Sequence, residues 1–239
     1  MGHAMGTTID IRRAADRFHT RIDWLDSWHS FSFGNHYDPK NVNHGLLLVH
    51  NEDRVTAGSG FPKHSHRDME IVTWVLEGEL RHQDSQGSDA VIYPGLAQRM
   101  SAGSGITHSE FNASRDEPVH FLQMWVLPDV EGVTPGYQEV DVQQELATGA
   151  LVKVAGGAGD AALSINQAHA DLWIARAHAN EALTVPDAPH VHVFVANGDA
   201  TLDGTEPLGP GDAARLTDAG SRTLTVGPDG AEVVIWATA

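Results

Sequence analysis

Apolar and polar residues alternate with a period of two in short runs along most of the chain. This pattern is typical of strands with one buried face, and it predicts strands that begin at Thr8 and cover 28–33 and 118–127. The run 71–76 is almost continuously β-branched and aromatic, which favours a strand covered on both faces. The two faces of 118–127 carry Phe121, Gln123 and Trp125 on one side and Leu122, Met124 and Val126 on the other. One of these faces should line the interior of a barrel.

Turn-forming residues separate the runs. RHQDSQGSDAV at 81–91 predicts a hairpin, in which Asp84 is more naturally a turn residue than a catalyst. Long amphipathic helical patterns are lacking, and only short helices fit, at 12–17 or 140–147. Short strands with Gly and Pro turns favour a barrel or a sandwich.

The second half of the chain resembles the first. HVHVFVANGDATLDG at 190–204 repeats the order of strand, glycine turn and hairpin of WVLEGELRHQDSQG at 74–87. We therefore expect an all-β protein with two consecutive β-domains, covering 1–130 and 131–239. The stretch 128–148, rich in Pro, Gly and acidic residues, is the candidate linker.

The composition indicates the compartment in which the protein is expected and the classes of molecule that it could bind. The 239 residues suffice for one large or two small β-domains, and the absence of cysteine excludes disulfides and thiolate metal sites. No apolar run is long enough to span a bilayer, so we expect a cytoplasmic protein with no membrane partner. The formal net charge of −17 opposes direct binding to nucleic acid, which depends on cationic side chains, but it leaves protein partners open.

Two polar pairs stand inside this β-prone sequence, His64 with His66 and His108 with Glu110. Each pair is spaced i, i+2, so both of its side chains point to one face of an extended strand. If the two strands are neighbours, three imidazoles and one carboxylate converge, which suits a first-row transition metal. Four protein ligands leave one or two positions open at a five- or six-coordinate ion, unlike the closed site of structural zinc.

Histidine is common in this chain, with 15 residues, so an isolated HxH pair is more often structural than metal-binding. His190 and His192 form such a pair, and we expect them to be structural or to lie at a rim. The same expectation holds for His29, His36, His44 and His50.

The spacing of the two clusters resembles the motifs of the cupin barrel. The first reads G-x5-H-x-H-x3-E from Gly58 to Glu70, and the second reads G-x2-H-x3-N in GITHSEFN. The runs GFPKHSHRDMEIVTWVLEGEL and QRMSAGSGITHSEFN narrow the resemblance to the pirin family, whose bacterial members include quercetin 2,3-dioxygenase-type enzymes. The resemblance is dense over the first 130 residues and thin beyond them. It implies a bicupin of two antiparallel jelly-roll barrels, one holding a metal and one degenerate.

The resemblance also implies a ligand set. The pirin ligands carry over to His64, His66, His108 and Glu110. The general cupin pattern takes its carboxylate from the first motif instead, which would be Glu70. We favour Glu110 because it shares a strand face with His108, and we keep Glu70 as a neighbouring candidate.

In the second half, alignment on the glycine and proline turns places no ligand opposite these four residues. The positions concerned are Thr184, Pro186, Leu224 and Val226. We therefore expect one metal per chain, in the first half.

The function implied by the resemblance is a metal-dependent dioxygenase that opens the flavonol ring of quercetin with O2 and releases carbon monoxide. Iron(II) is the metal that the family favours, and copper, nickel, cobalt or manganese suit the same ligands. The flavonol would chelate through its 3-hydroxyl and 4-carbonyl groups, and Glu110, or alternatively Glu70, would take the hydroxyl proton.

Two other functions use the same fold. One is a non-enzymatic protein-interaction or transcription coregulator module that responds to the metal or its redox state. The other is a cupin isomerase or decarboxylase. Such an enzyme usually takes its carboxylate ligand from the first motif, which would make Glu70 the ligand. The enzyme is favoured over the coregulator because the chain carries no basic tail or localisation run.

Overall fold

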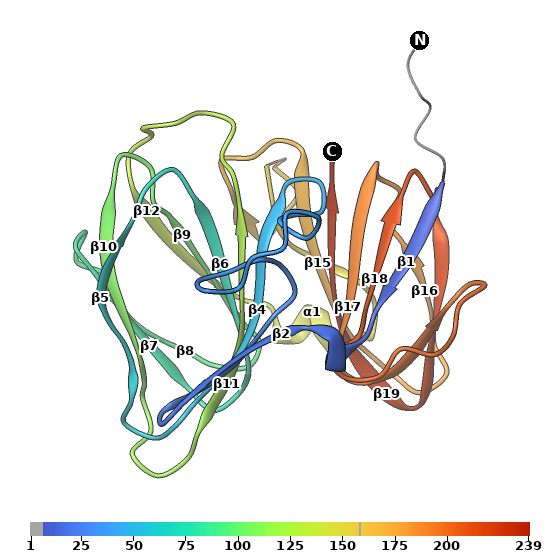
Figure 1. Cartoon of the computed structure of the whole chain (residues 1–239), viewed down its shortest axis with the longest axis horizontal. Coiled ribbons are helices and arrows are strands. Elements are labelled where there is room, and N and C mark those ends of the chain that lie inside the picture. The colour runs from blue at the N-terminus through green and yellow to red at the C-terminus, as the bar shows by residue number, and fades with distance from the viewer. Residues whose placement is uncertain (1–6, 158) are drawn as a thin grey trace.

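The computed structural model describes residues 7–157 and 159–239, and within them only two short helical turns accompany the strands. These turns are η1 (Ala14–Asp16) and α1 (Gln143–Leu146), where short helices were expected. Figure 1 shows two β-rich halves side by side, the first in blue to green and the second in orange to red. The all-β class expected from the alternating pattern is confirmed.

The first half contains two antiparallel sheets that face each other. The larger has the strand order β12-β9-β6-β11-β4-β3-β2, and the smaller has the order β5-β10-β7-β8. Their bounds are β2 (Phe18–Ile22), β3 (Leu25–His29), β4 (Leu47–Val55), β5 (Gly60–His66), β6 (Glu70–Glu77), β7 (Leu80–Asp84), β8 (Asp89–Ile92), β9 (Leu96–Ser101), β10 (Ile106–Asn112), β11 (Val119–Val126) and β12 (Gly136–Asp141). The run 71–76 lies in β6, near the centre of the larger sheet, and 71–75 are buried on both faces as expected.

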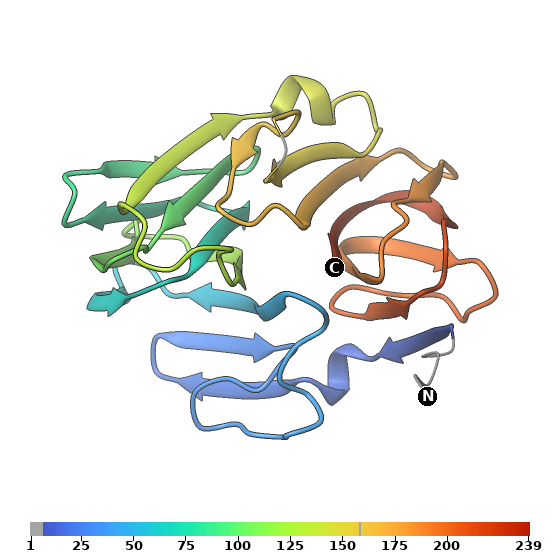
Figure 2. The same cartoon turned by 90° about the horizontal axis from the view of Figure 1, so that it is seen from above.

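The second half is one sheet of eight strands. Its order is β1-β18-β17-β19-β15-β13-β14, with β16 also paired to β19. The bounds are β1 (Thr8–Arg12), β13 (Val152–Gly156), β14 (Leu163–Ser164), β15 (Ala170–Ala177), β16 (Ala182–Val185), β17 (His190–Leu202), β18 (Ala213–Thr217) and β19 (Arg222–Thr238). Register shifts along the β17–β19 pair bend these long strands. Seen from above in Figure 2, the sheet curls round an interior of its own.

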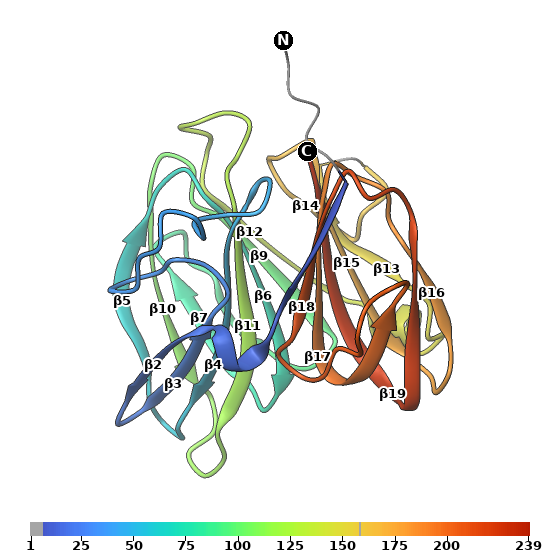
Figure 3. The same ribbon diagram turned by 45° about the vertical axis from the view of Figure 1, so that its right-hand side comes forward.

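Strands β1 and β12 each pair with a strand from the other side of the predicted boundary. β1, at the start of the chain, pairs with β18 of the second half, with Asp10 opposite Arg215. In Figure 3 this blue strand runs beside the orange β18. β12, which follows residue 130, pairs with β9 of the first half. The division into 1–130 and 131–239 stays a prediction, but the strand pairing does not follow it.

A shared apolar core joins the halves. It contains Trp74 and Leu122 from the first half and Phe194 from the second, all fully buried. The indole Nε1–H of Trp236 lies 3.1 Å from the sulfur of Met124 across the junction. The Leu122, Met124 and Val126 face of β11 therefore meets the other half, and the opposite face of the strand looks into the first half.

Buried neutral histidines at the junction should make stability depend on pH. His50 is fully buried, and burial, with Arg17 nearby, lowers its pKa to about 3. The unfolded chain, with a pKa of about 6.5, binds a proton that the folded state rejects. The contribution is therefore intact above pH 6.5 and is lost as pH falls toward 3, by about 2 kcal/mol at pH 5.

Urea titrations of the metal-free protein at pH 7 and pH 5 measure this loss. His50→Phe should show a smaller difference between the two pH values, because it removes one such group. An equal difference in both proteins would contradict the prediction.

Candidate metal centre

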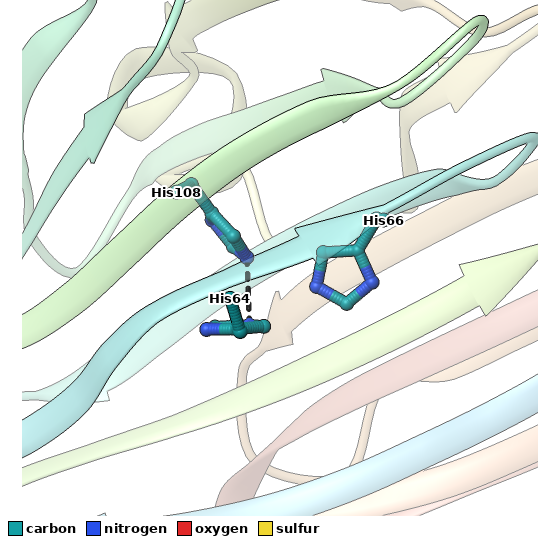
Figure 4. A group of neighbouring side chains, drawn as sticks. All are labelled: His64, His66 and His108. Carbon is teal, nitrogen blue, oxygen red and sulfur yellow. Dashed lines mark hydrogen bonds between the residues drawn. The ribbon is translucent and has the colours of Figure 1, made fainter.

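Three imidazoles converge where β5 and β10 lie side by side. His64 on β5 is directly opposite His108 on β10, and His66 follows on the same face of β5. The ring centroids of His64 and His108 are 4.4 Å apart, and both rings lie 4.9 Å from that of His66. Figure 4 shows the three rings gathered around one point. The convergence expected from the i, i+2 spacing is present for these three residues.

The imidazoles present lone pairs to that point. His64 donates its Nδ1–H to the carbonyl oxygen of Pro62 at 2.8 Å, which leaves its Nε2 facing His108 Nε2 at 3.0 Å. His66 Nε2 is buried without a partner among the described residues. Burial, with neighbouring histidines, lowers the pKa of His66 to about 4 and that of His108 to about 2. Neutral imidazoles with unpaired ring nitrogens fit a divalent transition metal.

Glu110 lies beside this cluster in a different arrangement from the one expected. It forms a second group with His82 and His108, and the structure does not bring all four predicted ligands into one group. Its carboxylate accepts a hydrogen bond from Gln123 Nε2 at 2.8 Å. Burial raises the pKa of Glu110 to about 7, although the hydrogen bond from Gln123 opposes the shift. A nearby metal cation would favour the carboxylate again, and Glu110 as a ligand stays a prediction.

A bulge in β5 sets this geometry, because two residues of β5 lie opposite one residue of β10. The register with β5 shifts between His108 and Glu110, so Glu110 is opposite Phe61. A Cβ at Gly60 would lie 2.2 Å from the carbonyl oxygen of Glu110, so only glycine lets β5 approach this closely.

Glu70 belongs to the junction between the halves. It is fully buried, and its carboxylate accepts hydrogen bonds from Ser101 Oγ at 2.8 Å and from the backbone and side-chain nitrogens of Asn166 at 3.0 and 3.1 Å. It shares its strand face with Val72 and Trp74 of the shared core, and it joins none of the groups of possible metal ligands among the described residues. This position does not favour Glu70 as a base or ligand.

A chain of polar side chains behind His108 was not predicted from the sequence. His82 Nε2–H donates to Asp84 at 3.0 Å, so the Nδ1 of His82 is an acceptor, 3.4 Å from the Nδ1–H of His108. The side chains of His82 and Asp84 are fully buried. Asp84 also accepts from the backbone of the turn, which confirms its turn role. The i, i+2 spacing of HQD was the available signal.

We expect Asp84→Asn to weaken metal binding by about 10- to 100-fold, because Asp84 fixes the His82 tautomer that orients His108. Competition with a chelator measures the affinity. Asp89→Asn, which removes an exposed carboxylate paired with Arg81 on the same hairpin, is the control and should bind as the wild type does. Equal affinities in both variants would exclude this role for Asp84.

The remaining histidines lie apart from the cluster. His29 Nδ1–H donates to the side-chain oxygen of Asn51 at 2.9 Å, and His44 Nε2–H donates to the carbonyl oxygen of Leu216 at 2.9 Å. His50 and His192 are buried at the junction. In the second half, the buried Leu224 belongs to an apolar core. No group of three possible ligands occurs there within 7–157 and 159–239.

A cavity of about 450 Å³ opens beside the imidazoles, within the range of 300–1,000 Å³ common for ligand pockets. It is lined by His64, His66, Glu110, Gln123, Trp125, Phe33 and Phe61, among others. Gln123 and Trp125 come from the expected inward face of β11, while Phe121 packs in a separate core cluster.

No helix among the described residues is long and apolar enough to cross a membrane.

Comparison with known proteins shows which family this chain resembles. Residues 11–126 match the Pirin family model, and residues 154–235 match the model described as the quercetinase C-terminal cupin domain. A Mycobacterium tuberculosis protein named "Putative quercetin 2,3-dioxygenase" is 56% identical over 97% of this chain and 96% of its own length. The Escherichia coli protein named quercetin 2,3-dioxygenase is 38% identical over 83% of this chain and 85% of its own.

A solved structure shows the same architecture. The crystal structure of the bacterial pirin YhhW from Escherichia coli in complex with nickel(II) is 34% identical, covers 96% of this chain and 98% of its own, and superposes with a TM-score of 0.86. The expected bicupin fold is confirmed, although the sheets are not closed by continuous pairing. With its three converging imidazoles and its two cupin domains, the chain belongs to the pirin family.

Proposed function

We propose that this protein is a metal-dependent dioxygenase of the quercetin 2,3-dioxygenase type. The observation that carries the proposal is a cluster of three imidazoles, two of which, His64 and His66, line a largely apolar cavity of about 450 Å³. The names of the Mycobacterium and Escherichia coli relatives support a flavonol and O2 as substrates.

The residues proposed to hold the metal are His64, His66, His108 and Glu110. Iron(II) is the ion we propose, and nickel, which the YhhW structure contains, suits the same ligands. When bound, such an ion supplies Lewis-acid polarisation of a substrate oxygen and access to one-electron chemistry.

The chain's own residues would position the substrate and accept its proton. Phe33, Phe61 and Trp125 offer apolar walls for flat rings. Glu110 is the proposed base for the 3-hydroxyl proton of the flavonol, and the Gln123 Nε2–H holds its carboxylate in place at 2.8 Å. Substrate and O2 together supply all atoms of the ring-opened ester and carbon monoxide.

With ferrous ion restored under air, the protein should consume quercetin and O2 in equal amounts and release one carbon monoxide per quercetin. Oxygen uptake, quercetin absorbance and trapped carbon monoxide measure the three quantities. A flavone that lacks the 3-hydroxyl is the control and should not react. If metal-loaded protein binds quercetin yet leaves it intact, with no uptake above free iron, the enzyme proposal fails and a metal-dependent interaction module replaces it.

A further inference from the structure

A small cavity with a basic lining lies at the junction of the two halves, away from the candidate metal centre. Its volume is about 110 Å³. Four arginines line it, together with His192, Ser30 and Asp16. The arginines are Arg12, Arg13, Arg17 and Arg215. In Figure 1 the blue helical turn η1, which carries Asp16, lies between the halves at this place. Such a concentration of arginine is unexpected in a chain with a net charge of −17.

Three of the arginines already have carboxylate partners. Arg12 pairs with Asp10 at 2.8 Å, Arg13 pairs with Asp212 at 2.8 Å, and Arg17 pairs with Glu52 at 2.7 Å. Their charges are largely balanced, and they form the wall of the cavity. The fourth arginine is different.

Arg215 is a buried cation that pairs with no carboxylate among the described residues. It is 5% exposed, and it donates to the Asn41 side-chain oxygen at 2.7 Å and to the Ser30 carbonyl oxygen at 2.6 Å. Its guanidinium lies 4.2 Å from the centroid of Phe31, which offsets part of the desolvation. Burial lowers the pKa of Arg215 to about 10, so it is charged at neutral pH. Buried charges in proteins are normally paired.

Unsatisfied hydrogen-bonding atoms face the same cavity. Arg215 Nε, Ser30 Oγ and both ring nitrogens of His192 are buried without partners among the described residues. Arg215 on β18 and His192 on β17 are directly opposite each other, so their side chains share a sheet face. Most buried polar atoms in proteins have a partner, so three residues with unpaired donors or acceptors around one cavity are suited to bind a polar ligand.

We propose that this cavity binds a small oxyanion, a phosphate or a monocarboxylate. An oxyanion supplies several acceptor oxygens and the negative charge that Arg215 lacks, and the guanidinium, the hydroxyl and one imidazole N–H are all donors. Water could satisfy the hydrogen bonds, but it would leave the buried charge unbalanced. The cavity volume of about 110 Å³ excludes a large ligand.

The proposed anion would connect the two halves of the chain. Ser30 and Arg17 belong to the first half, whereas His192 and Arg215 belong to the second. A ligand that binds only the folded protein stabilises it in proportion to the logarithm of its concentration. The exposed Asp16 at the cavity and the net charge of −17 oppose an anion, so we expect binding of modest affinity.

Thermal unfolding and calorimetric titration of the metal-loaded protein test the proposal, with sodium phosphate and sodium acetate as probes and sodium chloride at equal ionic strength as the reference. At least one probe should bind saturably and raise the unfolding temperature. A response to phosphate alone, or to acetate alone, identifies which oxyanion fits. Arg215→Met should bind that probe at least tenfold more weakly, with unchanged metal content. Arg21→Met, an exposed arginine elsewhere in the first half, should bind as the wild type does.

Arg215→Met should also be no less stable than the wild type in chloride, because it removes an unpaired buried charge. Where that variant does not fold, Ser30→Ala replaces it and should weaken binding several-fold. If neither probe binds the wild type, or if Arg215→Met, or Ser30→Ala in its place, keeps wild-type affinity, the cavity holds water only and the proposal is wrong.

Discussion

His64→Ala should retain less than a tenth of the metal held by the wild-type protein and should show no quercetin turnover. His64 contributes one of three imidazoles with ring centroids 4.4 to 4.9 Å apart, and its Nε2 is already directed at the common point by the hydrogen bond to Pro62. Removing this imidazole takes away a ligand whose lone pair is already oriented, so the remaining side chains should bind the ion much more weakly. Elemental analysis after chelator-free purification, followed by oxygen uptake, measures both losses.

The control for this variant is His190→Ala, which removes a histidine of the other HxH pair. It should keep about one metal per chain and normal turnover, because His190 contacts His44 and not the imidazole cluster. A metal content near two per chain that persists when His190 and His192 are both changed to Ala would reveal a second site and contradict the expectation of one.

The variants Glu110→Gln and Glu70→Gln should show which carboxylate binds the metal and which one stabilises the fold. The sequence alone left both residues as candidates for the ligand. Glu110→Gln should lower metal retention and change the spectroscopic signature of the ion, because a neutral amide is a weaker ligand than a carboxylate beside His108. Glu70→Gln should leave metal content near the wild-type level and lower the free energy of unfolding by about 2–3 kcal/mol. The loss follows because Glu70 accepts three hydrogen bonds at the junction with the second half.

Elemental analysis and urea unfolding of both variants give the two measurements. Ser101→Ala is the matched control for Glu70→Gln, since it removes one donor to Glu70 and should lower stability with unchanged metal content. Metal loss in Glu70→Gln with normal retention in Glu110→Gln would place the carboxylate ligand in the first motif, as in the general cupin pattern.

Local periodicity was enough to predict much of this protein. Side chains two residues apart on a strand share a face whatever the strand pairs with, so the grouping of His64 with His66 followed from spacing. The resemblance to the pirin motifs supplied the pairing with His108. The same alternation predicted the two faces of β11, one of which carries Gln123 and Trp125 into the cavity. The short helices near 14–16 and 143–146 also followed from local pattern.

Contacts between distant segments decided the rest, because alternation tells which residues share a face but not what that face meets. Glu70 follows His66 by four residues, yet it faces Asn166 of the second half. His82 and Asp84 were expected in a hairpin, and only the pairing of β7 with β10 places them behind His108. The exchange of β1 into the second half brings Asp10 opposite Arg215. None of these pairings is encoded by spacing along the chain, since each depends on strands that meet only when the whole fold is assembled.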